Sequence, residues 1–331
     1  MQMSENPMQD TSMGSGKNPM ETEKHFLQMK WKIGNVQIDN PFVLAPMAGV
    51  TDLPFRILCK EQGAGLICME MISAKAISFH NKNTIALMEI DPCEHPVSMQ
   101  LFGSEPDLMA DVAKSIEDRN FDILDINMGC PVPKVVNNGE GSALLKSPDL
   151  IEEIVRKVSS AISKPVTVKV RIGFENAPVD IVEIAKRVED AGAAAIAVHG
   201  RTRQQYYSGT ADWDTIRRVK EAVTIPIIGN GDVDSPLKAE ALMKQTGCDA
   251  VMVGRAVRGN PWLFRELNHY FRTGELMERP STEEIREMIL RHARKQIELK
   301  GEFVGIREMR MWHGTLQVCA TARVCEENQI R

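Results

Sequence analysis

The sequence predicts an α/β protein, a (β/α)8 TIM barrel followed by a small C-terminal all-helical domain. Short apolar and β-branched runs recur eight times between residues 42 and 253. Segments with helical periodicity separate them, which is typical of parallel βα units. Beyond Arg255 the alternation stops, and two helical segments of mixed charge follow. Eight units in about 215 residues fit a barrel of this class.

Before the barrel, residues 1–28 show no apolar periodicity, so we expect a disordered leader. Residues 29–36 read Met-Lys-Trp-Lys-Ile-Gly-Asn-Val and predict a short hairpin at the bottom of the barrel. The predicted barrel domain spans residues 29–258, and the predicted helical domain spans residues 259–310.

The predicted strands are residues 42–45, 65–70, 96–101, 122–127, 165–171, 194–199, 225–230 and 249–253. The intervening segments support this order. Ile181, Ile184, Ala185 and Val188 fall on one face of a predicted helix that ends at Gly192. Residues 262–270 and 281–300 are the two predicted helices of the appended domain.

The interval after the fourth predicted strand is unusually long and contains Cys130. Gly129, Pro131 and Pro133 prevent regular structure there, so Cys130 lies on a loop at the carboxyl end of a strand. Barrel enzymes place their reacting groups at this edge. A lone cysteine is more often a small buried apolar residue. Because a loop interrupted by glycine and proline is a poor place to bury a thiol for packing, Cys130 is the candidate catalytic residue.

The ends of the last two predicted strands resemble a phosphate site. They carry Asn230, Gly231 and Asp232, and then Gly254 and Arg255. Glycines allow close backbone approach, and an arginine supplies a fork of donors. Glycine pairs alone are mostly turns, but the arginine at the same edge favours phosphate binding.

Other strand ends carry further candidates. Pro46, Met47 and Ala48 follow the first strand, where small residues allow a flat ring to lie on the backbone, although a simple turn is the alternative. Lys169 lies within the fifth strand, and a buried lysine is costly unless paired. His199 ends the sixth strand and could alternatively be a hydrogen-bonded core histidine.

Arg171 lies two residues after Lys169 and so on the same strand face, from which it could reach a substrate carbonyl or phosphate. A solvated arginine at the rim is the alternative. Tyr206 and Tyr207 could stack on a splayed-out nucleotide or pack on the barrel.

Composition limits the class of protein. Apolar residues make up 43% of the chain and charged residues 26%, without an apolar run of the roughly 20 residues that a membrane span needs. The seven cysteines form no Cys-x-x-Cys pair, which favours a reducing cytoplasm over disulfides or a zinc site. The net charge of -5 requires any RNA-binding surface to be local. We expect a cytoplasmic monomer without metal or membrane contact.

The segment Asn-Met-Gly-Cys-Pro at 127–131, with the following Lys-Val and Gly-Glu-Gly-Ser-Ala-Leu-Leu, resembles the diagnostic motif of the tRNA-dihydrouridine synthases. The Pro-Met-Ala-Gly-Val-Thr-Asp element at 46–52 is similar too, and the resemblance covers about residues 31–310. Lys-Ile-Gly-Asn, Glu-Met-Ile-Ser-Ala-Lys and Gly-Ile-Arg-Glu-Met-Arg resemble the bacterial DusB branch, which acts on the D-loop.

This resemblance implies an oxidoreductase that reduces uridine in tRNA to 5,6-dihydrouridine with FMN and NAD(P)H. Hydride passes from flavin N5 to C6, Cys130 protonates C5, and Asn127 contacts the base. Gln100 would meet the pyrimidine edge of the flavin, while Lys169 and His199 would hold negative charge at N1–C2=O. The implied FMN residues are Pro46, Met47, Ala48, Gln100, Lys169, His199, Asn230, Gly231, Asp232, Gly254 and Arg255. Because the chain has no Gly-x-Gly-x-x-Gly dinucleotide fold, NADPH would dock transiently over the flavin.

Two other functions stay open. One is a different FMN-dependent barrel oxidoreductase that acts on a small molecule, against which the Cys130 motif and the helical domain both weigh. The other is a non-catalytic RNA-binding protein, which would not need Cys130 or Lys169.

The end of the chain departs from the resemblance. Relatives continue after position 310 with a lysine and then His-x-x-Trp-Tyr-x-x-Gly, where this chain reads Met-Trp-His-Gly-Thr-Leu-Gln-Val. Reading possible codons two nucleotides later permits Val-Ala-Trp-Tyr and then Gly-Leu. We therefore expect residues 311–331 to be a frameshifted tail that truncates the tRNA-binding domain and weakens tRNA binding.

Overall fold

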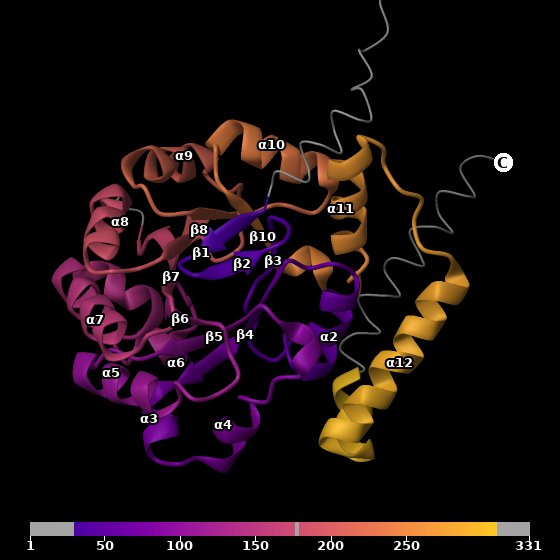
Figure 1. Cartoon of the computed structure of the whole chain (residues 1–331), viewed down its shortest axis with the longest axis horizontal. Coiled ribbons are helices and arrows are strands. Elements are labelled where there is room, and N and C mark those ends of the chain that lie inside the picture. Colours follow the sequence, from indigo (N-terminus) through magenta and orange to yellow (C-terminus); the bar gives the residue numbers. More distant parts are fainter. Residues whose placement is uncertain (1–29, 176–178, 310–331) are drawn as a thin grey trace, which may run out of the picture.

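The computed structural model describes residues 30–175 and 179–309. Eight parallel strands form a closed barrel in the order β10-β3-β4-β5-β6-β7-β8-β9 (Figure 1). Each overlaps one predicted strand, so the predicted fold class is confirmed. The strands are β3 (Phe42–Leu44), β4 (Leu66–Ser73), β5 (Val97–Phe102), β6 (Ile123–Met128), β7 (Val166–Gly173), β8 (Ala195–Thr202), β9 (Ile227–Asn230) and β10 (Ala250–Val253).

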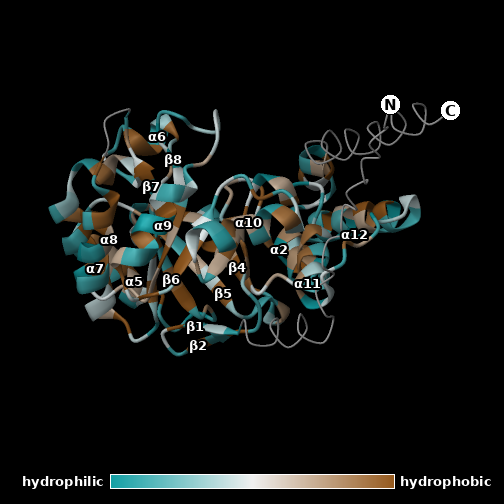
Figure 2. Ribbon diagram, turned by 90° about the horizontal axis from the view of Figure 1, so that it is seen from above, coloured by the Kyte–Doolittle hydropathy of each residue, from teal (hydrophilic) through white to brown (hydrophobic). Residues whose placement is uncertain are grey.

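Helices surround the barrel with their polar faces outward (Figure 2). Capping starts several of them, since Asp52, Asp180, Asp212 and Ser235 each accept a hydrogen bond from a backbone amide of the first turn. The helices are α2 (Leu53–Glu61), α3 (Ala74–Ser78), α4 (Lys82–Ala86), α5 (Pro106–Ser115), α6 (Pro133–Val136), α7 (Pro148–Ala161), α8 (Ile181–Asp190), α9 (Trp213–Ala222), α10 (Pro236–Thr246), α11 (Leu263–Thr273) and α12 (Thr282–Lys300), with 3-10 turns η1 (Pro92–Glu94), η2 (Gly141–Lys146) and η3 (Arg255–Val257).

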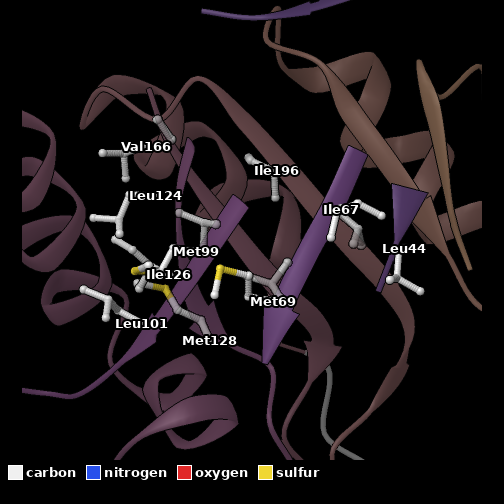
Figure 3. Packing of buried hydrophobic residues seen from close by; sticks show 14 of the residues in the cluster. Leu44, Ile67, Met69, Met99, Leu101, Leu124, Ile126, Met128, Val166 and Ile196 are labelled. Atoms are coloured by element: carbon white, nitrogen blue, oxygen red, sulfur yellow. The ribbon is translucent and has the colours of Figure 1, made fainter. Parts of the chain in front are cut away.

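Strand side chains alternate between two cores. Outward-facing residues such as Met69, Met99 and Met128 pack against the helices, and part of this cluster is shown in Figure 3. The predicted helical stripe that includes Ile184 and Val188 is buried in the same cluster. Inward-facing residues fill the lower half of the barrel and leave polar side chains for the upper half.

The predicted hairpin is present. β1 (Trp31–Ile33) and β2 (Val36–Ile38) pair antiparallel. Ile33 and Ile38 are fully buried in the inward-facing cluster, together with Val43 and Met252. This apolar layer closes the barrel from below, and the barrel opens at the end where the strands finish.

The boundary between the barrel and the helical segment differs from the prediction. The sequence analysis grouped α11 with the appended domain, but Leu263, Phe264 and Leu267 of this helix are buried in the core that surrounds the strands. The ring of Phe271 also lies 5.0 Å from that of Phe42. α11 therefore belongs to the outer layer of the barrel.

α12 begins with a capping box between Ser281 and Glu284 and lies against α2 at the side of the barrel (Figures 1 and 2). The leader at 1–28 and the tail at 311–331 lie outside the described residues. Within 30–175 and 179–309, no helix is both long and apolar enough to span a membrane.

Candidate active site

A cleft of about 1080 Å³ opens at the carboxyl ends of the strands. All the residues predicted for catalysis, cofactor or substrate line it, some from strands whose alternation points them inward above the apolar layer and the others from the loops that follow the strands. They are Pro46, Met47, Ala48, Gln100, Asn127, Cys130, Lys169, Arg171, His199, Asn230, Gly231, Asp232, Gly254 and Arg255. Ligand sites commonly have volumes of roughly 300–1,000 Å³, so the cleft can take a large ligand.

Cys130 is held by its backbone on the loop after β6. Its amide donates to Asn127 Oδ1 at 2.9 Å, and its carbonyl accepts from the Ser142 hydroxyl at 2.8 Å. Gly141 is required beside it, because its φ is +59° and a Cβ there would lie 2.9 Å from the Cys130 oxygen. Burial raises the pKa of the Cys130 thiol despite the nearby Arg171 and Lys169 charges. The thiol therefore keeps its proton at neutral pH.

Lys169 extends from β7 into the cleft. Its Nζ donates to Asn230 Oδ1 at 3.3 Å, and Asn230 Nδ2 donates to the Met252 carbonyl at 2.8 Å. Burial, together with the charge of Arg171, lowers the pKa of Lys169 to about 8. A half-buried ammonium group with one long hydrogen bond, facing the cleft, favours an anionic ligand.

His199 lies on β8, paired in register with Arg171 of β7 and Asn230 of β9. Burial and the charges of Lys169, Arg171 and Arg201 hold the pKa of His199 far below its usual value, so the imidazole is neutral. It can donate one N–H to a negative group. Gly231 is required beside it, because its φ is +133° and a Cβ there would lie 2.6 Å from the Ala211 Cβ.

The carboxylate of Asp232 accepts hydrogen bonds from other residues of the protein. One oxygen accepts from Arg201 Nη2 at 2.8 Å and from the Ala211 amide at 2.7 Å, and the other accepts from Arg255 Nη2 at 3.4 Å. Although burial opposes ionisation, the Ala211 amide and Arg201 hold the pKa of Asp232 below its usual value. The carboxylate thus orients two arginines at the phosphate loops.

The structure excludes one of the two alternatives for Arg171, a solvated arginine at the rim. The guanidinium is not a solvated rim group, because the residue is only 3% exposed. Its Nε donates to the Gly129 carbonyl at 2.9 Å, and its Nη1 donates to the carbonyls of Thr202 at 3.0 Å and Tyr206 at 2.9 Å. Burial lowers the pKa of Arg171 to about 10. The side chain ties the loop of Cys130 to the loop of Tyr206.

Tyr206 and Tyr207 stand at the rim and are about half exposed. Their rings meet edge to face at 4.7 Å, and the Arg255 guanidinium lies 4.6 Å from the centre of the Tyr207 ring. The two alternatives were packing on the barrel and stacking on a nucleotide. Half-exposed rings beside the cleft fit the second, because they leave an aromatic surface open to a ligand.

Sequence reasoning missed Arg201, which is 1% exposed and pairs with Asp232. Its position two residues after His199, on the same strand face, was the available signal. Met71 and Trp213 also line the cleft and were not singled out. Among the described residues, no group of His, Cys, Asp or Glu could hold a metal ion.

The residues fit a flat, anionic cofactor such as FMN. Lys169, Arg171, Arg201 and Arg255 gather positive charge at this end of the barrel. Gly254 lies against Ala45 and Met47, where a Cβ would contact both side chains at 3.5–3.7 Å and fill the space beside the Pro46–Ala48 segment.

Fold and site together define a (β/α)8-barrel enzyme whose reacting groups lie at the carboxyl ends of its strands. The family model described as "Dihydrouridine synthase (Dus)" matches residues 43–329. The chain therefore belongs to the dihydrouridine synthase family, which classes it with the flavoprotein oxidoreductases that modify tRNA.

Individual relatives point to the same branch. The chain is 45% identical over 276 residues to tRNA-dihydrouridine synthase B of Vibrio parahaemolyticus, with 83% of this chain and 86% of the relative covered. It is 44% identical over 279 residues to tRNA-dihydrouridine synthase B of Pseudomonas putida, with 83% and 82% covered. The resemblance to the DusB branch is confirmed.

Two solved structures share the fold at low identity. Histamine dehydrogenase from Rhizobium sp. 4-9 matches with a TM-score of 0.60 and 14% identity over 77% of this chain and 49% of that one. The 6-hydroxypseudooxynicotine amine oxidase of Pseudomonas geniculata N1 matches with a TM-score of 0.59 and 14% identity over 76% and 51%. The chain spans about half the length of each, and these matches show the fold alone.

Proposed function

We propose that this protein reduces uridine in the D-loop of tRNA to 5,6-dihydrouridine, with bound FMN as cofactor and NAD(P)H as reductant. The observation that carries the proposal is one cleft that holds a protonated cysteine, a half-buried lysine and a neutral histidine from three neighbouring strands and the loop between them. Membership of the dihydrouridine synthase family supports the substrate.

FMN, once reduced, would supply a hydride for C6 of the uracil ring. Cys130 would donate its proton to C5, so that one hydrogen is added at each end of the C5=C6 bond. The thiolate that remains would regain a proton from solvent before the next turnover. A thiol with a raised pKa suits this part, because it stays protonated until the ring accepts the proton.

The other residues of the cleft would bind and orient. Lys169 and the N–H of His199 would face the electron-rich edge of the flavin, and Pro46, Met47 and Ala48 would support the ring. Asn230, Gly231, Gly254 and Arg255 would hold the ribityl chain and phosphate, with Asp232 orienting Arg255. Asn127 and Arg171 would meet the uracil, Arg171 through the part of its guanidinium that does not bind the backbone.

The uridine must leave the base stack to reach Cys130, since this residue is only 9% exposed and lines the cleft. Tyr206 and Tyr207 offer exposed rings at the rim on which a neighbouring base could stack. α12 and the residues that follow it would contact the tRNA outside the cleft. NAD(P)H would dock transiently over the flavin.

Replacing Cys130 by alanine tests the assignment. We expect Cys130→Ala to lower dihydrouridine formation on unmodified tRNA by about 10²–10⁴-fold, the usual contribution of a positioned general acid. The flavin content and the rate of NADPH oxidation by the flavin should stay near wild type. Nucleoside mass spectrometry and stopped-flow absorbance measure the two. Equal loss of both would make Cys130 structural, and a pure protein unable to bind FMN would contradict the cofactor.

A further inference from the structure

Four buried polar side chains form a continuous hydrogen-bonded row beneath and beside Cys130. Thr167 Oγ1 donates to Asp125 Oδ1 at 2.6 Å, and Gln100 Nε2 donates to Asp125 Oδ2 at 2.6 Å. Asn127 Nδ2 donates to Gln100 Oε1 at 2.9 Å. Asn127 Oδ1 accepts from the backbone amides of Gly129 at 3.2 Å and Cys130 at 2.9 Å. We call these four side chains the relay.

Strand register assembles the relay. Gln100 pairs with Asp125, and Asp125 pairs with Thr167, so these three lie side by side on β5, β6 and β7. Gln100 and Asn127 line the cleft, whereas Asp125 and Thr167 lie in the layer below and do not. All four side chains are buried, with exposures between 1% and 7%.

The direction of every hydrogen bond in the relay is fixed from one end. Backbone amides can only donate, so the atom of Asn127 that faces them must be its oxygen. The Asn127 nitrogen then faces Gln100 and requires an acceptor, which places the Gln100 oxygen there. The Gln100 nitrogen consequently faces Asp125, which must accept. Reversing any one amide would set donor against donor or acceptor against acceptor.

Asp125 suits its position at the end of the relay, between Gln100 and Thr167, because an ionised carboxylate can only accept hydrogen bonds. Burial raises the pKa of Asp125, while hydrogen bonds from Gln100 and Thr167 and the charge of Lys169 oppose that effect. Without a partner that accepts at this point, the Gln100 N–H would be left unsatisfied and the Gln100 amide would be held from the Asn127 side alone, so the pattern of donor and acceptor that it shows to the cleft would be less firmly set.

We propose that Asp125 and Thr167 are positioning residues that fix the orientation of the Gln100 amide and, through Asn127, hold the backbone of Cys130. The effect on catalysis rests on the proposed function, whereas the effect on Cys130 does not. Gln100 thereby presents one oxygen and one N–H to the ligand in a set order, and the thiol is kept at one position on the cleft floor.

The test exploits the polarity of the relay. Asn127→Asp keeps the shape and the oxygen that faces the two amides, but sets a second oxygen against Gln100 Oε1. Gln100 must then turn, and its oxygen meets the Asp125 carboxylate. Adding Asp125→Asn supplies a donor there, so the double variant restores an unbroken relay of opposite direction. Ser98→Ala, a buried polar residue of β5 outside the relay, is the matched control.

The readout is the rate at which iodoacetamide alkylates Cys130 in the purified protein, followed by mass spectrometry of the Cys130 peptide, together with the melting temperature. We expect Asn127→Asp to react about tenfold faster, since an unsatisfied buried group promotes local opening, and to melt lower. The defect should grow as pH rises, because a protonated carboxyl at position 127 can still donate to Gln100. The double variant should return towards wild type in both measurements, and Ser98→Ala should match wild type throughout.

Two results would overturn the proposal: wild-type reactivity and melting of Asn127→Asp at all pH values, or no recovery in the double variant. If Asn127→Asp fails to fold, recovery of a folded double variant supports the relay and its absence refutes it. Alkylation needs neither FMN nor tRNA, so failure of the relay and failure of the proposed function are seen separately. If the wild-type protein forms dihydrouridine but the relay variants alkylate Cys130 at the wild-type rate, the proposed function stands and the proposal about the relay is refuted.

Discussion

Lys169 is the charged residue of the cleft that responds most directly to an anionic ligand. Its pKa of about 8 in the free protein reflects burial beside Arg171. An anion bound next to it would raise that pKa, so binding above pH 8 takes up a proton. Because binding takes up this proton, the affinity for the anion is highest below pH 8 and falls as the pH rises above 8.

We therefore predict that FMN affinity weakens by up to tenfold per pH unit above about pH 8. Fluorescence titration between pH 7 and 9.5 measures it, a window above the phosphate pKa of roughly 6. Lys169→Met should bind FMN more weakly and lose most of this slope. An unchanged slope in Lys169→Met would assign the pH dependence to another group.

At the scale of elements, a buried junction fixes α12 to the start of α2. Asp52 caps α2 through the Phe55 amide, and its other oxygen accepts from Gln296 Nε2 at 2.6 Å and from Lys300 Nζ at 2.7 Å. Lys300 also donates to Glu308 at 2.6 Å. Because Asp52 directly follows the segment at 46–51 that lines the cleft, the position of α12 is linked to the site.

We predict that Lys300→Met weakens the docking of α12 by about 1–2 kcal/mol, less than a fully buried charged hydrogen bond, because the side chain is partly exposed. Hydrogen exchange of the α12 amides should accelerate about tenfold, whereas amides of β6 and β7 should not change. Arg294→Met, at an exposed position on the same helix, is the control. Equal exchange in both variants would show that apolar contacts alone hold α12.

At the scale of the whole molecule, the chain is negative overall but carries a local group of positive side chains. The chain has a net charge of -5, yet Lys169, Arg171, Arg201 and Arg255 gather around His199 at one end of the barrel. A polyanion would be attracted to that end and repelled elsewhere, so binding of tRNA would depend on few contacts and on salt.

The sequence from 311 onward bears on this affinity. We predict that replacing residues 311–331 by the ending read in the alternative frame strengthens tRNA binding and steepens its dependence on salt, through added basic contacts. FMN content should not change, because the described barrel is complete without these residues. Filter binding at several salt concentrations measures the effect, and equal affinity of the two proteins would refute the proposed truncation.

The sequence alone determined the barrel and the edge at which the site lies. Short apolar runs in the strands and glycine or proline after several of them are local signals, and they put Cys130, Lys169 and Asn230 on one rim without any knowledge of contacts. The motif around Cys130 then pointed to the family that the comparisons confirmed.

Only the tertiary structure decided how those side chains are used. Arg171 binds three carbonyls from two segments that are distant in the sequence. His199 is neutral because it is buried and four cations lie around it, and α11 belongs to the barrel because its apolar face meets Phe42. Asp125 likewise gains its place from register across three strands. Charge state, hydrogen-bond direction and burial depend on neighbours distant in the chain, so local patterns do not contain them.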